Sequence, residues 1–197
     1  MKIICVAKNY RITKPSEPVV FLKPDSSLLK DGKPFFIPDF SSDLRGEIEI
    51  VVKISRLGKN IAPRFAHRYY EEVTAGIDLT ACDLLERLQS GSLPWEMSKA
   101  FDNSAIIGNF VALKTCDADV NHLPFHLNIN EKRVQEGHTE NQLFSIDEII
   151  AYVSRFFTLK IGDLIFTGAP SAGIKLQIDD HLQGYIGENR VLDFFVK

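Results

Sequence analysis

The segment Glu47–Ser55 (EIEIVVKIS) constrains the fold of this 197-residue chain more than any other. Side chains alternate between the two faces of a β-strand, so the apolar residues at positions 48, 50, 52 and 54 share one face. Glu47 and Glu49 share the opposite face. A strand with an apolar face of this length needs a second layer of structure to cover it, which favours a layered, sheet-based fold.

Several other segments have the composition of strands. The chain contains 14 phenylalanines, and aromatic and β-branched residues gather between turn signals. Strands are predicted at Met1–Ala7, Val19–Lys23, Phe35–Ile37, Asp163–Thr167, Gln183–Ile186 and Val191–Val196. A hairpin around Asn130-Glu131 is predicted to join Leu127–Asn130 to Lys132–Gln135.

Helices are predicted between these strands. One covers Pro63–Thr74, with a proline at its start, and another begins near Thr80 and ends at Gly91–Pro94. A further helix follows the capping-box pattern Ser145-x-x-Glu148. Its apolar residues at helical spacing are Ile149, Ile150, Val153, Phe156 and Phe157. We therefore expect one domain over residues 1–197, of α+β class and strand-dominated, built as a mixed β-sandwich or β-roll.

Charge and cysteine content exclude several classes of protein. The 23 Lys and Arg against 26 Asp and Glu give a net charge of −3, without the basic surplus typical of nucleic-acid binding. No apolar run approaches the roughly 18–20 residues that span a bilayer, and the apolar start MKIICVA is shorter than a signal sequence requires. Cys5, Cys82 and Cys116 form no C-x-x-C pair. We expect a cytoplasmic protein with no membrane or nucleic-acid partner.

Three acidic residues form the most informative candidate site. Glu47 and Glu49 point to the same side of their strand, and two carboxylates that close repel each other unless a cation or water lies between them. Asp78 lies in the apolar segment Ala75–Leu79, where a carboxylate needs a partner. A solvent-facing strand and a backbone-capping Asp78 are the plain alternatives. If the three acids bind a metal, their oxygen ligands favour Mg²⁺, Mn²⁺ or Ca²⁺ over zinc.

Two further segments carry candidate functional groups. Lys99 follows Trp95, and it is either a surface lysine or a positive charge in a site. Thr167 and Gly168 lie in a turn that ends an apolar strand, where a hydroxyl and backbone amides are able to bind an oxyanion or simply form the turn. The five histidines have no metal-ligand spacing, and we assign them no role.

The order of these segments resembles the fumarylacetoacetate hydrolase family, especially its small acylpyruvate hydrolase and oxaloacetate decarboxylase branch. The similarity extends over nearly the whole chain. The motifs that carry it are Ala7–Tyr10, Glu17–Pro24, Glu47-x-Glu49, Gly76–Ala81, Leu93–Trp95 with Lys99-x-Phe101, Arg133–Thr139, Phe144–Ile146 and Gly162–Gly168.

The resemblance implies a homodimer with a β-rich roll that acts on a small 2-oxo acid. It implies that Glu47, Glu49 and Asp78 hold Mg²⁺ or Mn²⁺, which acts as a Lewis acid and stabilises an enolate during C–C hydrolysis or decarboxylation. At the position matching Lys99, the family places a positive charge beside the developing oxyanion. Thr167 and Gly168 match the positions that hold the far end of the substrate.

The chain departs from the family pattern in the segment after Asn9-Tyr10. The family has a histidine and a glutamate there, on a mobile lid, that activate the attacking water. This sequence has Arg11–Ser16 instead, which is shorter and contains no histidine, and Glu17 matches a different family position.

Four single positions also differ. Cys82 replaces an arginine and Leu85 a glutamine, so polar groups that reach the substrate are lost. Ala169 replaces a threonine, and Lys8 stands where arginine is common.

Three interpretations of these departures remain open. In the first, the protein has a complete lid and this sequence omits some of its residues. In the second, the protein catalyses only what the metal and Lys99 support, such as decarboxylation or keto–enol tautomerisation. In the third interpretation the protein binds metal and keto acid without turnover. A plain interaction domain with Glu47 and Glu49 in solvent is a weaker alternative.

Overall fold

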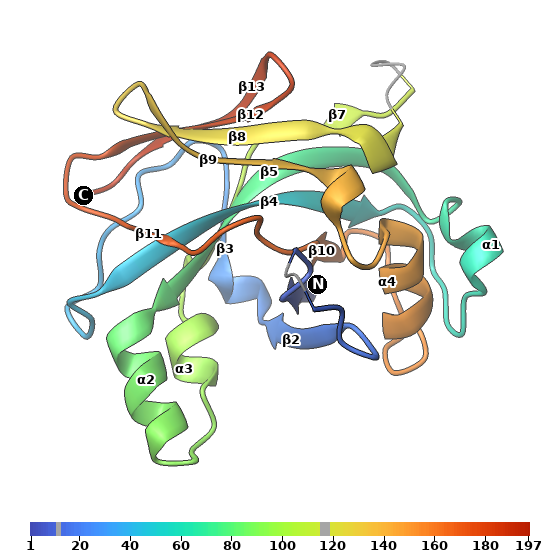
Figure 1. The fold of residues 1–197 in the computed structure, drawn as a ribbon, viewed down its shortest axis with the longest axis horizontal. Coiled ribbons are helices and arrows are strands. Elements are labelled where there is room, and N and C mark those ends of the chain that lie inside the picture. The colour runs from blue at the N-terminus through green and yellow to red at the C-terminus, as the bar shows by residue number, and fades with distance from the viewer. Residues whose placement is uncertain (11–12, 115–118) are drawn as a thin grey trace.

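The computed structural model describes residues 1–10, 13–114 and 119–197 (Figure 1). Strands in this part of the chain form two sheets. The larger sheet has nine strands in the order β2-β1-β10-β4-β5-β6-β3, with β11 paired to β4 and β7 paired to β5. The smaller sheet has four strands in the order β13-β12-β8-β9. The predicted strand-dominated α+β class is confirmed.

The strands of the larger sheet come from both halves of the chain. They are β1 Ile3–Ala7, β2 Val19–Lys23, β3 Leu28–Leu29, β4 Leu44–Ile54, β5 Tyr70–Ala81, β6 Ala105–Ile107, β7 Val111–Ala112, β10 Leu164–Phe166 and β11 Ile174–Lys175. The smaller sheet contains β8 Pro124–Ile129, β9 Lys132–His138, β12 His181–Ile186 and β13 Asn189–Phe195. The pairing of β1 with β10 is parallel, whereas β4 pairs antiparallel with both β10 and β5.

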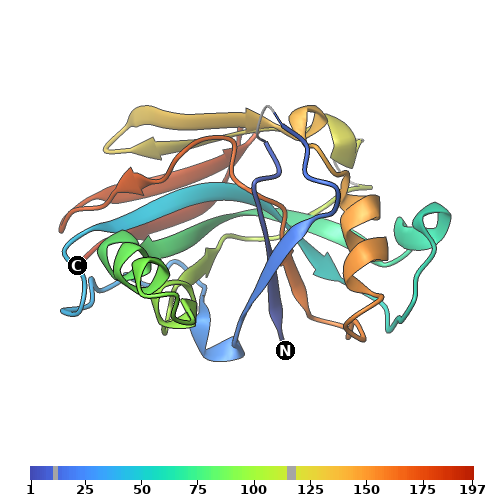
Figure 2. The same ribbon diagram turned by 60° about the horizontal axis from the view of Figure 1, so that its bottom comes forward.

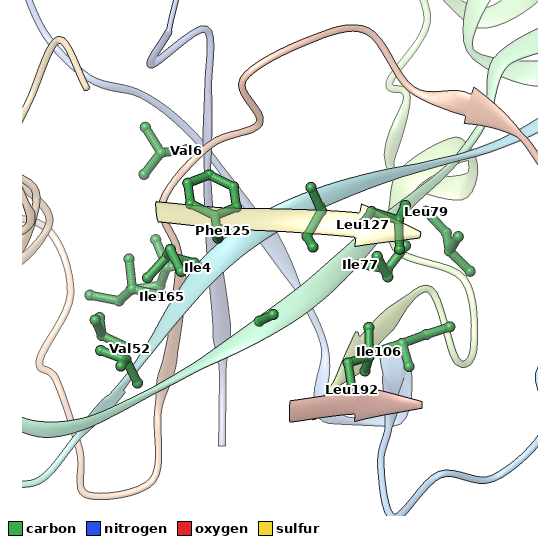
Figure 3. Close-up of a cluster of buried hydrophobic side chains, with 14 of the residues drawn as sticks. Ile4, Val6, Val52, Ile77, Leu79, Ile106, Phe125, Leu127, Ile165 and Leu192 are labelled. Carbon is green, nitrogen blue, oxygen red and sulfur yellow. The ribbon is translucent and has the colours of Figure 1, made fainter. Parts of the chain in front are cut away.

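The two sheets enclose the main apolar core. Figure 2 shows the smaller sheet stacked on the β4–β5 part of the larger one, with β1 and β2 running steeply across the direction of β4. Phe125 and Leu127 of β8 lie over β4 and β5, and Leu192 of β13 lies near Ile106 (Figure 3). The apolar face predicted for the strand at Glu47–Ser55 is the face that this second layer covers.

Four α-helices are present in the described residues: α1 Pro63–Ala66, α2 Cys82–Ser90, α3 Glu96–Lys99 and α4 Ile146–Val153. Short 3₁₀ turns occur at Asp25–Ser27, Val120–His122 and Thr139–Asn141. The capping box of Ser145 and Glu148 opens α4 as predicted, although Phe156 and Phe157 lie beyond its end. None of these helices is long and apolar enough to cross a membrane.

The prediction of a helix over Pro63–Thr74 is wrong beyond its first turn. After α1, the chain enters β5 at Tyr70, and β5 pairs with β4 from Tyr70 to Ala81 with one register shift between Tyr70 and Glu72. The proline correctly marks the start of a helix, but Val73 is buried in a strand and extends the apolar alternation of Ala75, Ile77 and Leu79. Tertiary pairing with β4 therefore overrides the local helical pattern.

Smaller boundary differences have similar causes. Thr80 remains in β5, and α2 begins at Cys82 without a side-chain cap. Phe35 forms only an isolated bridge to Val196 rather than a strand. The hairpin at Asn130-Glu131 is confirmed, and both residues have positive φ (50° and 66°), as a tight type I′ turn requires.

Gly76 lies opposite Glu49 in the β4–β5 pairing, where the chain has no room for a side chain. A Cβ atom there would lie 2.7 Å from Val51 Cγ2, 2.8 Å from Phe166 Cε1 and 3.0 Å from the Ile106 carbonyl oxygen. The close fit keeps the two central strands packed directly against their neighbours.

We expect Gly76→Ala to lower the free energy of unfolding by about 1–3 kcal/mol, because overpacking a closed core forces the strands apart. Urea denaturation measures this change. Gly91→Ala is the matched control, since a Cβ at Gly91 has only ordinary contacts of 3.4 Å or more. Equal stability of the two variants would contradict the packing argument.

Candidate active site

Glu47, Glu49 and Asp78 come together because β4 and β5 pair antiparallel in a fixed register. Glu47 is the direct partner of Asp78, and Glu49 is the partner of Gly76, the residue two positions before Asp78. Glu49 and Asp78 are only 3% and 2% exposed, so the alternative of a solvent-facing strand does not hold for this pair. The Glu47 side chain is about a quarter exposed.

Two lysines surround Asp78. Lys99, the last residue of α3, donates to Asp78 Oδ2 at 2.7 Å, and its Nζ lies 3.7 Å from Glu47 Oε2. Lys23, the last residue of β2, places its Nζ 2.6 Å from Asp78 Oδ1 and is completely buried. Lys99 is therefore part of the carboxylate cluster, and the alternative of a plain surface lysine is excluded.

Lys23 is held on several sides, which fixes its ammonium group under Asp78. It donates to the carbonyl oxygens of Leu79, at 3.2 Å, and Ser104, at 2.7 Å, and to the Ser104 hydroxyl at 3.1 Å. A lysine is almost never fully buried unless it is paired in this way. No sequence pattern singled out this residue, although an isolated lysine at the end of an apolar strand is a signal that could have done so.

Glu49 has a different environment from Asp78. Its Oε2 accepts a hydrogen bond from the Gly168 backbone amide at 2.7 Å, and within the described residues it has no ion-pair partner. Burial and the nearby charges of Asp78 and Glu47 raise the pKa of Glu49 well above its usual range. The cluster thus contains one buried carboxylate whose charge no lysine balances.

The charges of the cluster set the protonation of its other members. Burial raises the pKa of Glu47 above its ordinary value, against the effect of Lys99. Burial alone would also raise the pKa of Asp78, but Lys23 and Lys99 hold it below its ordinary value. Burial disfavours the charged form of Lys99, yet Asp78 and Glu47 outweigh it and raise the Lys99 pKa. Lys99 is therefore an ammonium ion at neutral pH, suited to stabilise negative charge and not to accept a proton.

One cavity of about 1050 Å³ is lined by the four residues predicted from the sequence, Glu47, Glu49, Asp78 and Lys99. Its wall also contains apolar groups from β1, β2 and the loop before α3, including Val6, Phe21 and Trp95. The Phe21 and Trp95 rings meet edge to face, with centroids 5.5 Å apart, and Lys99 Nζ lies 5.1 Å from the Phe21 centroid. Carboxylates, an ammonium group and aromatic rings therefore share the wall of this cavity. The elements β2, α2 and α3, which contribute residues to it, lie in the lower part of Figure 1.

Thr167 and Gly168 lie next to the cluster, but their polar groups are already engaged. The Thr167 hydroxyl donates to the Ile50 carbonyl at 2.8 Å and accepts from Gln142 at 2.9 Å. The Gly168 amide binds Glu49, and Gly168 has a positive φ of 105°. A substrate-binding role for both residues stays a prediction, and it requires the Thr167 hydroxyl to exchange one of its partners.

The segment that departs from the family pattern contributes Thr13 to the lining of the cavity. Its residues 11 and 12, like Cys116, lie outside the described part of the chain. Before it, Asn9 is buried and fixes the end of β1: its side-chain amide donates to the carbonyl oxygens of Phe144 and Thr167, and its Oδ1 accepts from the Phe144 amide. Tyr10 also lines the cavity, and its buried hydroxyl has no hydrogen-bond partner among the described residues.

The residues present suit a divalent cation, although the side chains are not arranged around one. Within the described ranges, no group of three or more His, Cys, Asp or Glu side chains forms a ready-made metal site. Lys99 instead lies between two of the carboxylates. Even so, Glu49 has no ion-pair partner among the described residues, and the donors are all carboxylate oxygens, as Mg²⁺ prefers. A metal-binding role for Glu47, Glu49 and Asp78 stays a prediction.

Removing Lys23 tests the electrostatic balance under the site. We expect Lys23→Met to lower the free energy of unfolding at pH 7 by roughly 3 kcal/mol, the cost of leaving a buried charge without one of its partners. Because the pKa of Asp78 is depressed in the folded protein, its stabilising effect exists above the unfolded pKa of about 4 and disappears at lower pH. The difference in the free energy of unfolding between Lys23→Met and the wild type should therefore become smaller below about pH 4.

Lys197→Met provides the control for this change in urea denaturation. Lys197 pairs with Asp179 at 2.8 Å, but both side chains are exposed. Such surface pairs contribute about 1 kcal/mol or less. If Lys23→Met destabilised the protein no more than Lys197→Met, the buried Lys23–Asp78 pair would not make the proposed contribution to the free energy of unfolding.

Comparison with known proteins identifies the family. Residues 2–191 match the fumarylacetoacetate hydrolase C-terminal domain. The chain is 35% identical to the mitochondrial oxaloacetate tautomerase of Mus musculus, over 99% of this chain and 91% of that protein. It is 31% identical to an oxaloacetate tautomerase of Escherichia coli, over 92% of this chain and 86% of that protein.

Solved structures agree with this assignment. A Yersinia pestis protein described as a fumarylacetoacetate hydrolase family member has a TM-score of 0.93 and 31% identity, covering 100% of this chain and 93% of its own. The fumarylpyruvate hydrolase of Pseudomonas aeruginosa, solved with Mn²⁺ and pyruvate, has a TM-score of 0.91 and 27% identity, covering 100% and 89%. The resemblance inferred from the motifs is confirmed: the chain belongs to the fumarylacetoacetate hydrolase family.

Proposed function

We propose that this protein is a divalent-cation-dependent enzyme that stabilises the enol or enolate form of a small 2-oxo acid. The observation that carries the proposal is the cluster of Glu47, Glu49, Asp78 and Lys99 in the wall of one cavity. Relatives support it, since two of them are oxaloacetate tautomerases and one neighbour was solved with Mn²⁺ and pyruvate.

Glu47, Glu49 and Asp78 are the residues that would hold the cation, Mg²⁺ or Mn²⁺. When bound, the cation would supply Lewis-acid polarisation of the keto group. Lys23 and Lys99 pair with Asp78 and Glu47, whereas Glu49 has no ion-pair partner among the described residues and its pKa is raised. A cation beside Glu49 would favour its ionised form, which supports a cation at this place.

Lys99 supplies the electrostatic part of the chemistry. Its Nζ carries a proton at neutral pH and is fixed by Asp78, so it is able to hydrogen-bond to an oxygen that gains negative charge during enolisation. Lys23, buried beneath Asp78, cannot contact a ligand in the cavity and acts by positioning Asp78. Phe21 and Trp95 limit the access of water to the same oxygen.

Keto–enol tautomerisation is the reaction that we consider first, with decarboxylation and C–C hydrolysis after it. Hydrolysis needs a base that activates water, and no histidine is among the described residues that line the cavity. Tautomerisation and decarboxylation both proceed through an enolate and need no activated water. In tautomerisation, the proton that leaves the carbon beside the keto group passes to solvent, and a proton from solvent is added at the keto oxygen. A member that binds metal and keto acid without turnover remains the alternative.

Homodimer formation and a cytoplasmic location are further parts of the proposal. They come from the resemblance and from composition. The name of the mouse relative places that protein in mitochondria, so location within the cell is a separate question for this chain.

An assay of oxaloacetate decides between these reactions. We expect the purified protein with Mg²⁺ to accelerate the keto–enol interconversion, followed by enol absorbance, well above the rate with Mg²⁺ alone, and to lose this activity in EDTA. Pyruvate release and acylpyruvate cleavage are measured in parallel. Calorimetric binding of oxalate that depends on Mg²⁺, without turnover of any substrate, would favour the non-catalytic alternative.

Glu49→Gln tests the metal site separately from catalysis. The amide keeps an oxygen for the Gly168 amide but removes a formal charge, so we expect the affinity for Mg²⁺ or Mn²⁺ to fall at least tenfold in calorimetry. The metal-free variant should be no less stable than the wild type, because it has lost a buried carboxylate without an ion-pair partner. Unchanged metal affinity would show that Glu49 is not a ligand.

Lys99→Met tests the electrostatic role. Loss of one preorganised donor to an oxyanion typically costs about 10²–10³-fold in kcat, and we expect a decrease of this size. Lys175→Met, which removes an exposed lysine outside the cavity lining, serves as the control. A Lys99→Met enzyme with wild-type kcat would remove Lys99 from the mechanism.

A further inference from the structure

The cavity extends beyond the carboxylate cluster to a second cationic group. Arg45 lies on β4 two residues before Glu47, on the same face of the strand, and it lines the cavity together with Thr80, Cys82 and Gln89. Two residues of strand correspond to about 7 Å. Arg45 and Glu47 thus start about 7 Å apart on one side of the strand, and both side chains line the cavity.

Arg45 is partly pre-oriented by its neighbours. Its Nε and Nη2 donate to the two carboxylate oxygens of Asp43, both at 3.0 Å. An arginine has five N–H groups, so three remain for another acceptor. Lys175, the register partner of Arg45 on β11, reaches the same Asp43 at 4.0 Å, so this trio keeps a net positive charge.

Several residues that line the cavity with Arg45 are small or uncharged. Cys82, at the start of α2, has a short side chain and belongs to the same cavity wall. Gln89, seven residues further along α2, lines the same cavity and adds an uncharged donor. On the other side, Gly173 packs against Arg45 and Glu47: a Cβ there would lie 3.0 Å from Arg45 Cβ and 3.1 Å from Glu47 Cγ.

We propose that Arg45, with Gln89 of the same cavity wall, binds the second carboxylate of a 2-oxo dicarboxylate. This inference rests on the proposed function, because the 2-oxo acid end of the same molecule is assigned to the Glu47, Glu49, Asp78 and Lys99 cluster. It makes Arg45 the residue that selects four- or five-carbon dicarboxylates over monocarboxylates such as pyruvate. A planar guanidinium with free N–H groups suits a carboxylate better than a lysine does.

Lys8 is the competing cation in the cavity wall. It follows β1 in a left-handed conformation with φ of 62° and lies next to Asn9, whose Cβ is close to Gly168 at the Glu49 side of the cluster. Lys8 and Arg45 therefore flank the carboxylates from different sides. Arg45 is favoured because Asp43 pre-orients it, whereas Lys8 has no ion pair among the described residues.

The experiment compares two ligands that differ in one carboxylate. Binding of pyruvate and of freshly dissolved oxaloacetate is measured by calorimetry with saturating Mg²⁺, together with KM and kcat for oxaloacetate. We expect Arg45→Met to raise the Kd and KM for oxaloacetate about tenfold or more, as for loss of a charge-assisted hydrogen bond. The Kd for pyruvate should change less than twofold, and Arg45→Lys should have an intermediate effect.

Two further variants make the assignment specific. Lys175→Met removes a charge from the same Asp43 group outside the cavity lining, and Lys8→Met removes the competing cation. Both should leave the preference for oxaloacetate over pyruvate within twofold of the wild type. A loss of preference in Lys8→Met, or equal effects of Arg45→Met on both ligands, would overturn the inference.

The failure of the inference is distinguishable from failure of the proposed function. If the wild-type protein binds oxalate in a Mg²⁺-dependent manner but Arg45→Met leaves the preference for oxaloacetate unchanged, only the role of Arg45 is refuted. If the wild type shows no Mg²⁺-dependent binding of oxalate, pyruvate or oxaloacetate, the proposed function is refuted and this inference with it.

Discussion

The antiparallel pairing of β4 with β5 determines the arrangement of the site. Its register places Glu47 directly across from Asp78, and the glycine opposite Glu49 lets the neighbouring strands pack closely. Because both strands are long and their apolar faces are covered by the smaller sheet, a shift in register would expose the core as well as separate the acids. The same interaction therefore stabilises the fold and positions the functional groups.

Charge balance at the cluster illustrates how function and stability compete. Lys23 and Lys99 allow Asp78 to remain ionised in a buried place, while Glu49 stays buried without an ion-pair partner among the described residues. Arrangements of this kind are costly in a protein interior and cluster at functional sites. The proposed binding of a cation and a small anionic ligand is a function that would use this arrangement.

Much of the fold was accessible from the sequence where one local pattern decided the structure. The alternation in Glu47–Ser55, the capping box of Ser145 and Glu148, and the hairpin at Asn130-Glu131 all correspond to observed elements. The extent of β5 was not accessible, because Tyr70–Thr74 becomes a strand only through its pairing with β4. The acids and Lys99 were found from motifs, but Lys23 and Arg45 were missed, since their significance depends on which residues the fold brings beside them.

The hydrogen bonds of Asn9 have a consequence for how the protein acquires its site. Asn9 joins the first strand to Phe144 and Thr167, which lie 135 and 158 residues further along the chain. Contacts between such distant segments form slowly during folding, because bringing the two ends of a long loop together costs conformational entropy. During synthesis, the wall of the cavity near Gly168 therefore cannot assemble until Thr167, 158 residues after Asn9, has left the ribosome.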